Sequence, residues 1–314
     1  MPELRVHRVT KYDPADRDEN GWYVGPLDVD CDEGPIEAAY LETAAAFARA
    51  AGVERLTVRD PGGTAVDDWS GPAAERTGAA GLFAEPTGFH DGAEVDLATG
   101  IELVRAMLRE SGGWCRLEAG DRFFVHVGWD LYMYVGTAGP VGPGVERARE
   151  LGLFPEPLDE SPYAPEPDGS ASEVPADAAY WERLERAVAA GGVRLLQEYF
   201  AGSAARWHRL EAEGDVAAVR ARLVPRSRLS AWPSLFGAAP AEVLGGLDPE
   251  GYHHLLVEHP GGVLSGCWVD LEDAEDTAVL DGAVRLALVP EGPGALPDAV
   301  LPDADGVVRV RGYG

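Results

Sequence analysis

The stretch GWCRLEAGDRFFVHVGWDLYMYVGT, residues 113–137, predicts three antiparallel strands joined by two tight turns. The first expected turn covers residues 119–121, where Gly120 supplies the left-handed backbone that a three-residue hairpin loop needs. The second covers residues 128–130. The pairs expected across these turns are Leu117 with Phe123, Cys115 with Val125, Val127 with Leu131, and Val125 with Met133.

Successive side chains of a strand point to opposite faces, so this meander has two faces of different composition. One face is wholly apolar, as a core face is: Cys115, Leu117, Phe123, Val125, Val127, Leu131, Met133 and Val135. The other is aromatic and partly charged: Trp114, Arg116, Glu118, Arg122, Phe124, His126, Tyr132 and Tyr134. A slip of one residue in either turn would mix the two sets, so their clean separation supports the alternation.

The aromatic face has two interpretations. A sheet surface that is aromatic and cationic suits base stacking by single-stranded RNA. The alternative is the underside of a sheet that is buried on both faces, because aromatic residues are common in strands. Under the first interpretation the candidate ligand-binding residues are Trp114, Arg116, Arg122, Phe124, His126, Tyr132 and Tyr134.

The segments around the meander predict an α+β protein. Those of the N-terminal half are a strand at 4–12, a helix at 35–51 opened by Pro35, a strand at 54–59, a helix at 97–108 with Asp96 as N-cap, and a short helix at 145–151. Strand, helix and strand in this order favour a parallel crossover. We therefore expect a mixed sheet that ends in the meander and is covered by helices on one face.

The second half predicts a smaller α+β domain. A stretch rich in proline and acids, residues 155–176, is expected to link an N-terminal α+β binding domain, residues 1–154, to this C-terminal domain, residues 177–314, whose role the sequence leaves open. The elements expected in the C-terminal domain are helical pieces over 178–210 broken at Gly191–Gly192, strands at 218–224, 252–258, 263–269, 284–289 and 307–311, and a short helix at 241–246.

The formal charge of −28 is the most unusual property of the composition. Acids exceed bases in both halves, so long-range attraction to a phosphate backbone is not expected, whereas attraction to a basic protein is. Cys31, Cys115 and Cys267 are too few and too scattered for a disulfide framework. With no signal-like segment and no long apolar run, we expect a cytoplasmic protein that does not span a membrane.

A long acidic loop, residues 13–33, is the second candidate site. Eight carboxylates surround Trp22 and Tyr23, which resembles an aromatic anchor for a basic protein partner. The alternating Asp28, Asp30 and Asp32 suggest calcium, but the glycine and glutamate that an EF-hand loop requires at its sixth and twelfth positions are missing. We expect a solvated loop without a metal.

No catalytic motif is recognisable in the sequence. His126 and Cys115 point to opposite faces, His90 is expected to bond to its own backbone, and the adjacent His253 and His254 alternate across a strand. The sequence therefore predicts a protein that is not an enzyme and uses no cofactor.

The N-terminal half resembles a family of acidic actinobacterial proteins that are often given the automatic name "RNA-binding protein". The resemblance rests on VHRVTKYDPADRDENGWY at 6–23, GPIEAAYL at 34–41, TGFHDGAEV at 87–95, and the block from Glu102 to Gly136. It extends to about residue 163, carries no catalytic residues, and suggests RNA as the ligand.

Two functional hypotheses follow. The first is a non-catalytic cytoplasmic protein that binds single-stranded RNA through the aromatic face of the meander. The second is an acidic protein of the immunity or inhibitor type that binds a basic protein through Trp22, Tyr23, Asp28, Asp30 and Asp32.

Overall fold

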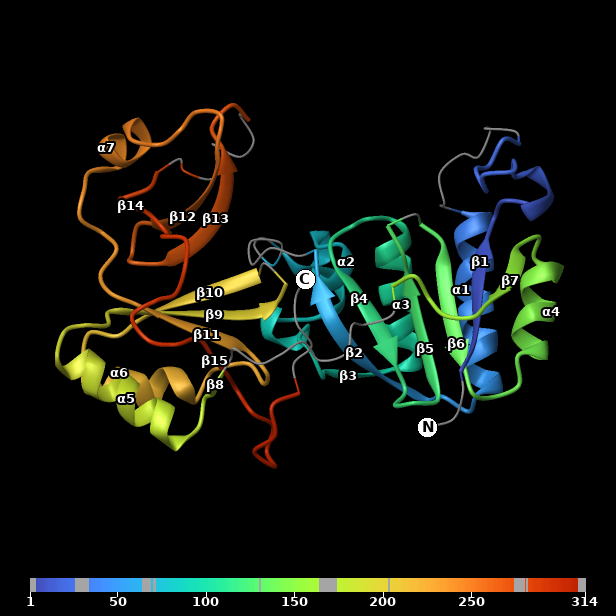
Figure 1. Ribbon diagram of the computed structural model, residues 1–314, viewed down its shortest axis with the longest axis horizontal. Helices are drawn as coiled ribbons and strands as arrows, with labels where there is room; N and C mark the ends of the chain where they lie inside the picture. Colours follow the sequence, from blue (N-terminus) through green and yellow to red (C-terminus); the bar gives the residue numbers. More distant parts are fainter. Residues whose placement is uncertain are drawn as a thin grey trace. The chain divides into compact units, whose positions relative to one another are not determined.

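The computed structural model describes residues 4–25, 34–63, 69, 72–129, 131–163, 174–202, 204–273, 280 and 282–309. The chain divides into two compact units. Unit 1 comprises residues 1–169, 201–203 and 311–314, and unit 2 comprises residues 170–200 and 204–310. Helices and several sheets occur together, so the expected α+β class is confirmed (Figure 1).

Unit 1 is built on a seven-stranded sheet of order β3-β2-β4-β5-β6-β1-β7. Its strands are β1 (Arg5–Thr10), β2 (Arg55–Gly62), β3 (Glu94–Asp96), β4 (Trp114–Glu118), β5 (Phe123–Val127), β6 (Met133–Thr137) and β7 (Phe154–Leu158). All pairings between neighbours are antiparallel, so the expected mixed sheet is wrong. β1 and β2 do run in the same direction, but the whole meander lies between them.

The meander has the predicted faces although its register is shifted. Leu117 pairs with Val125 rather than Phe123, and Val127 pairs with Met133 rather than Leu131. Each turn lies one residue further along the chain than expected, because the N–H of Ala119 bonds to Phe123 and that of Gly128 bonds to Tyr132. Leu131 adopts a positive φ of 56° in the second turn. A shift of two residues preserves the side-chain alternation, so the error leaves the two faces unchanged.

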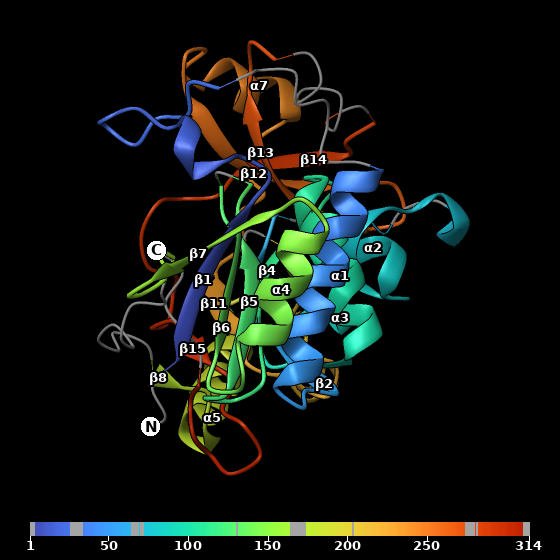
Figure 2. The same ribbon diagram turned by 90° about the vertical axis from the view of Figure 1, so that its right-hand side faces the viewer.

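The apolar face of the meander is the core of unit 1. Cys115, Leu117, Phe123, Val125 and Met133 are all buried. The helices α1 (Pro35–Ala50), α3 (Leu97–Leu108) and α4 (Gly142–Glu150) lie on one side of the sheet in Figure 2, and α2 (Gly78–Leu82) packs against α3. The predicted helical cover over this face is confirmed.

Local signals fix the two main helices. Asp96 accepts a hydrogen bond from the backbone N–H of Thr99 at 2.8 Å and so caps α3. Gly100 lies so close to Leu56 that a Cβ there would meet its Cδ1 at 2.5 Å, which lets α3 approach the sheet. The buried Glu37 of α1 pairs with Arg105 and Arg109, which joins α1 to α3.

Unit 2 contains a five-stranded sheet of order β10-β9-β11-β15-β8. Its strands are β8 (Val174–Pro175), β9 (Leu195–Ala201), β10 (Ala204–Arg209), β11 (Arg228–Trp232) and β15 (Ala299–Val300). The helices α5 (Ala178–Ala189) and α6 (Glu213–Arg220) bury Tyr180, Leu184 and Val216 against it.

A separate three-stranded sheet of order β13-β12-β14 completes unit 2. It consists of β12 (Tyr252–Glu258), β13 (Leu264–Asp270) and β14 (Arg285–Leu288), and the short helix α7 (Pro240–Gly245) packs against it. Trp207 and Trp232 from the five-stranded sheet share a hydrophobic cluster with Leu256 of β12, so the two sheets of this unit have a common core.

Several expectations for the second half are wrong. The helix predicted after Gly192 is the hairpin of β9 and β10, and the strand predicted at 218–224 is the end of α6 and a turn. All of β8 and all of β7 except Phe154 lie in the stretch assigned to a linker, and β7 pairs with β1 in the sheet of unit 1. None of the described helices combines the length and the apolar character needed to cross a membrane.

Candidate functional site

The aromatic face of the meander is covered in the structure. Phe124, His126 and Tyr134 are buried, and Val6 joins their cluster. Tyr163 lies edge-on against both His126 and Tyr134, with ring centroids 5.5 and 5.4 Å away. An incoming base therefore has no free ring face at these residues in this structure.

A hydrogen bond closes the cover over His126. Its Nε2 lies 3.0 Å from Oγ of the buried Ser161. Burial, and secondarily the charge of Arg116, lowers the pKa of His126 to about 3, so the ring is neutral at physiological pH. The segment 159–163, expected to be linker, thus acts as a lid on the aromatic face.

The other members of the predicted RNA site are dispersed. Arg116 is buried over the ring of Phe124, 3.5 Å from its centroid, and pairs with Glu118 at 2.7 Å. Arg122 is exposed, and Tyr132 is half-buried. Trp114 stacks on Trp129 with centroids 6.0 Å apart, and Trp129 is 77% exposed. Trp114 and Trp129 form an open corner near this face.

The acidic loop presents Trp22 to solvent. The side chain is 73% exposed, whereas its neighbour Tyr23 packs on Tyr12 with ring centroids 4.5 Å apart. An Asp18 carboxylate oxygen accepts hydrogen bonds from the backbone N–H groups of Asn20 and Trp22, both at 2.9 Å. Asp28, Asp30 and Asp32 lie outside the described residues.

Salt bridges hold this loop to the sheet. Arg17, which forms a β-bridge with Tyr23, donates to both carboxylate oxygens of Glu156 at 2.8 and 3.0 Å. Arg8 binds the same carboxylate. Burial would raise the pKa of Glu156, but the hydrogen bonds from Arg17 and Arg8 lower it. We call residues 17–23 the Trp22 hairpin, because these contacts fix its position and leave Trp22 outside.

Several buried ionisable groups have structural partners. Glu198 is completely buried and accepts hydrogen bonds from His208 at 2.8 Å, Arg206 at 2.9 Å and Ser227 at 3.0 Å. His90 contacts the backbone carbonyl of the adjacent Asp91 through its Nδ1 at 2.9 Å. Burial raises the pKa of the Cys115 thiol. In the described part of the chain, no group of three or more His, Cys, Asp or Glu side chains is placed to hold a metal ion.

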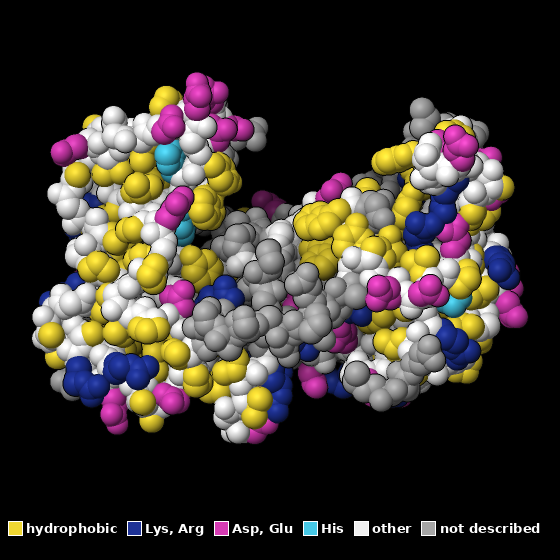
Figure 3. Space-filling model, in the orientation of Figure 1, with side chains coloured by type: hydrophobic (Ala, Val, Ile, Leu, Met, Phe, Trp, Pro, Cys, Tyr) yellow, Lys and Arg dark blue, Asp and Glu magenta, His cyan; other side chains and the backbone are white. Residues whose placement is uncertain are grey.

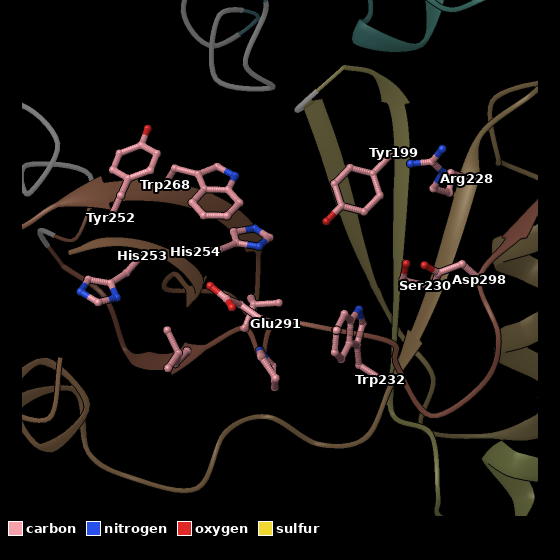
Figure 4. A pocket seen from close by; sticks show the side chains of 14 residues that line it. Tyr199, Arg228, Ser230, Trp232, Tyr252, His253, His254, Trp268, Glu291 and Asp298 are labelled. Carbon is pink, nitrogen blue, oxygen red and sulfur yellow. The ribbon is translucent and has the colours of Figure 1, made fainter. Parts of the chain in front are cut away.

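Unit 2 contains a pocket of about 440 Å³ that the sequence analysis did not identify. Figure 4 shows its side chains converging from two sheets and from the C-terminal segment. The five-stranded sheet contributes Tyr199, Arg228, Ser230 and Trp232. The three-stranded sheet contributes Tyr252, His253, His254 and Trp268, and Glu291 and Asp298 come from the C-terminal segment.

One wall of this pocket is a row of stacked rings, Tyr252, Trp268 and His254. Trp268 lies opposite His254 in the β12–β13 register, with ring centroids 4.7 Å apart and planes at 12°. Tyr252 stacks on Trp268 at 5.5 Å and 15°. Tyr252 and Trp268 are 65% and 46% exposed, and Figure 3 shows hydrophobic side chains beside histidine and acidic ones over these strands.

The charges in the pocket are unequal. Burial lowers the pKa of His254 to about 4 and raises that of Tyr199 to about 12, so both are neutral at physiological pH. The lining also includes two carboxylates, Glu291 and Asp298, and one guanidinium, Arg228. Oδ1 of Asp298 is buried and accepts no hydrogen bond from the described residues.

The register of β12 and β13 accounts for this wall. The sequence analysis expected His253 and His254 to point apart, and Nε2 of His253 indeed lies 2.7 Å from the Asp248 carbonyl, whereas His254 stacks on Trp268. The residues Tyr252 and His254 alternate on one face, and pairing around the turn at His259–Gly262 brings Trp268 between them.

Comparison with known proteins gives no further guide to the site. No family model matches the chain. No curated protein matches it, and no solved structure does either. The resemblance to the acidic actinobacterial family remains a prediction from the sequence.

Proposed function

We propose that the protein is a non-catalytic binding protein that engages a basic protein partner through the Trp22 hairpin. The observation that carries this proposal is the 73% exposure of Trp22 on a hairpin whose backbone is held by defined contacts. Large exposed aromatic residues are typical hot spots of protein interfaces, and a pre-ordered anchor reduces the entropy lost on binding.

Charge favours a basic partner. Asp18 and Glu19 are exposed beside Trp22, and the whole chain carries −28. Such a surface accelerates association with a cationic protein, and salt weakens the attraction. Replacing the exposed Glu19 by Lys should slow association and reduce its dependence on salt.

RNA binding is the second candidate, now assigned to a different place. The exposed Trp129, stacked on Trp114 at an interplanar angle of 7°, offers one outer ring face on which a base can stack. Of the candidate ligand-binding residues named from the sequence, this proposal keeps Trp114. It leaves out the buried Phe124, His126 and Tyr134 and adds Trp129.

Two matched variants separate these candidates. Trp22→Ala and Trp129→Ala each remove one exposed tryptophan from unit 1. In capture from native lysate, with protein and nucleic acid both identified, Trp22→Ala should lose the basic protein and Trp129→Ala should retain it. Loss of a hot-spot residue costs about 2 kcal/mol or more, which is about 30-fold in affinity.

The reverse pattern would support RNA. In that case Trp129→Ala would lose an oligonucleotide that wild type and Trp22→Ala both retain. If neither variant changes the set of captured molecules, both assignments are wrong.

A further inference from the structure

We propose that the pocket between the two sheets of unit 2 binds a small organic cation, an amine that carries a ring. This site is separate from the Trp22 hairpin and does not depend on the function proposed for it. Its volume of about 440 Å³ lies within the range of ordinary small-molecule sites and suits a ligand of one or two rings.

The aromatic residues provide the first argument for a cation. The wall of Tyr252, Trp268 and His254 faces Tyr199, whose hydroxyl points toward His254 in Figure 4. Aromatic rings carry negative potential on their faces and attract organic cations, most strongly where water is partly excluded. The cluster containing Trp232 and Val289 forms an apolar floor against which the ring of a ligand can pack.

The carboxylates provide the second argument. In Figure 4 the carboxylate of Glu291 lies below His254 and is separated from Arg228, which lies beside Tyr199 at the other end of the pocket. No ion pair of Glu291 occurs among the described residues. An ammonium group bound there would gain a charge-assisted hydrogen bond.

The end of the pocket near Arg228 also favours a cation. Asp298 raises and Arg228 lowers the pKa of the Tyr199 phenol, so one carboxylate and one guanidinium lie near this end of the pocket. The buried Oδ1 of Asp298 still lacks a donor among the described residues. A buried acceptor without a partner is costly, and an N–H group of the ligand would satisfy it.

The lining of the pocket disfavours a ligand of the opposite charge for the same reasons. An anionic ligand would meet Glu291 and Asp298 with Arg228 as its one cationic lining residue. His254 offers no positive charge, since burial keeps it neutral at physiological pH.

A series of ligands that differ in charge tests this inference. Calorimetric titration of the full chain with 2-phenylethylamine, 2-phenylacetamide and phenylacetate compares a cation, a neutral molecule and an anion with one ring. The amine should bind at least about tenfold more tightly than the amide, and phenylacetate should not bind measurably.

Variants then locate the site. Glu291→Gln should weaken amine binding about tenfold, whereas Glu272→Gln, an exposed carboxylate outside the pocket, should not. Trp268→Leu should weaken it as well. Trp22→Ala should bind the amine as wild type does, which keeps this test independent of the partner proposal.

Three outcomes would overturn the inference. They are equal affinity for the three ligands, a preference for phenylacetate, and amine binding that Glu291→Gln leaves unchanged. An absence of heat with all three ligands at millimolar concentration would count equally against it.

Discussion

The two units each stack a histidine against an aromatic ring on a β-sheet, with opposite consequences. In unit 1, His126 lies 5.3 Å from Tyr134 with planes at 14°. In unit 2, His254 lies 4.7 Å from Trp268 with planes at 12°. The local geometry is nearly the same, yet His126 is completely buried, whereas His254 is half-buried and its neighbours Trp268 and Tyr252 are 46% and 65% exposed.

The difference comes from a distant segment. Ser161 and Tyr163 cover His126 and Tyr134, whereas the row of rings in unit 2 opens into a pocket. Strand alternation determines which side chains share a face and stack. Whether that face is open depends on another part of the chain, so aromatic alternation alone does not indicate a binding surface.

The variants with the largest expected effect on the free energy of unfolding truncate one ring in each unit. Phe124→Ala removes a ring that is 3% exposed and should lower the free energy of unfolding by about 3–5 kcal/mol. Trp268→Ala removes a ring that is 46% exposed and should cost less than about 1.5 kcal/mol. Denaturant unfolding, followed by probes in each unit, measures both.

Similar losses of unfolding free energy for the two variants would contradict the contrast between a covered and an open aromatic face. Trp268 would then be as important to its unit as a core residue, and its exposure would say little about ligand binding.

A second test uses pH, because burial lowers the pKa of His126 from 6.5 to about 3. Below pH 6.5 the unfolded chain takes up a proton that the folded chain cannot, so the stability present above this pH is lost progressively toward pH 3. Between pH 7 and 5 the loss from His126 should be about 2 kcal/mol. His7 and His254 act in the same direction.

His126→Phe isolates this contribution, since it keeps a ring in the cluster and removes the titrating group. Its unfolding free energy should fall less steeply than that of wild type over the same pH interval. Parallel curves would mean that the cover opens readily enough for His126 to be protonated in the folded chain.

The first half of the fold was largely predictable from the sequence. Periodicity and caps located β1, α1, β2 and α3, and the separation of residue types assigned both faces of the meander. The pairing register was wrong by two residues because the position of each turn depends on backbone details such as the positive φ of Leu131, which residue types do not reveal. The error had no effect on the faces because the strand period is two.

The second half was less predictable for a physical reason. The sequence LLQEYFA at 195–201 is apolar enough for either a helix or a buried strand, and periodicity does not separate these over so few residues. The buried Glu198, bound to Arg206 and His208 of the paired strand, is a contact that only the hairpin creates. β15 has two residues and leaves no pattern at all.

The candidate sites depended on long-range contacts in the same way. The position of the Trp22 hairpin depends on Glu156, which lies about 140 positions after Arg17 in the sequence. The cover over His126 depends on Ser161, which lies 35 positions after it. The pocket of unit 2 combines side chains from β9, β11, β12 and β13 with the C-terminal segment. A sequence pattern within one helix or strand cannot predict these contacts, because each joins residues from different elements.

The smallest expected effects on the free energy of unfolding come from two histidine–serine hydrogen bonds, one in each unit. His126 and Ser161 are both buried with Nε2 and Oγ 3.0 Å apart, whereas His259 and Ser265 are both half-buried with the same atoms 2.7 Å apart. Ser161→Ala should cost between about 1 and 2 kcal/mol of unfolding free energy, because it leaves Nε2 of His126 buried without a partner. Ser265→Ala should cost less than about 0.5 kcal/mol, because water can replace the lost hydroxyl. Denaturant unfolding of both variants at pH 7 measures the difference, and equal costs would show that the lid over His126 admits water. Segment 159–163 would then cover the aromatic face of unit 1 without holding it closed against water, and the two aromatic faces would differ less than their exposures indicate.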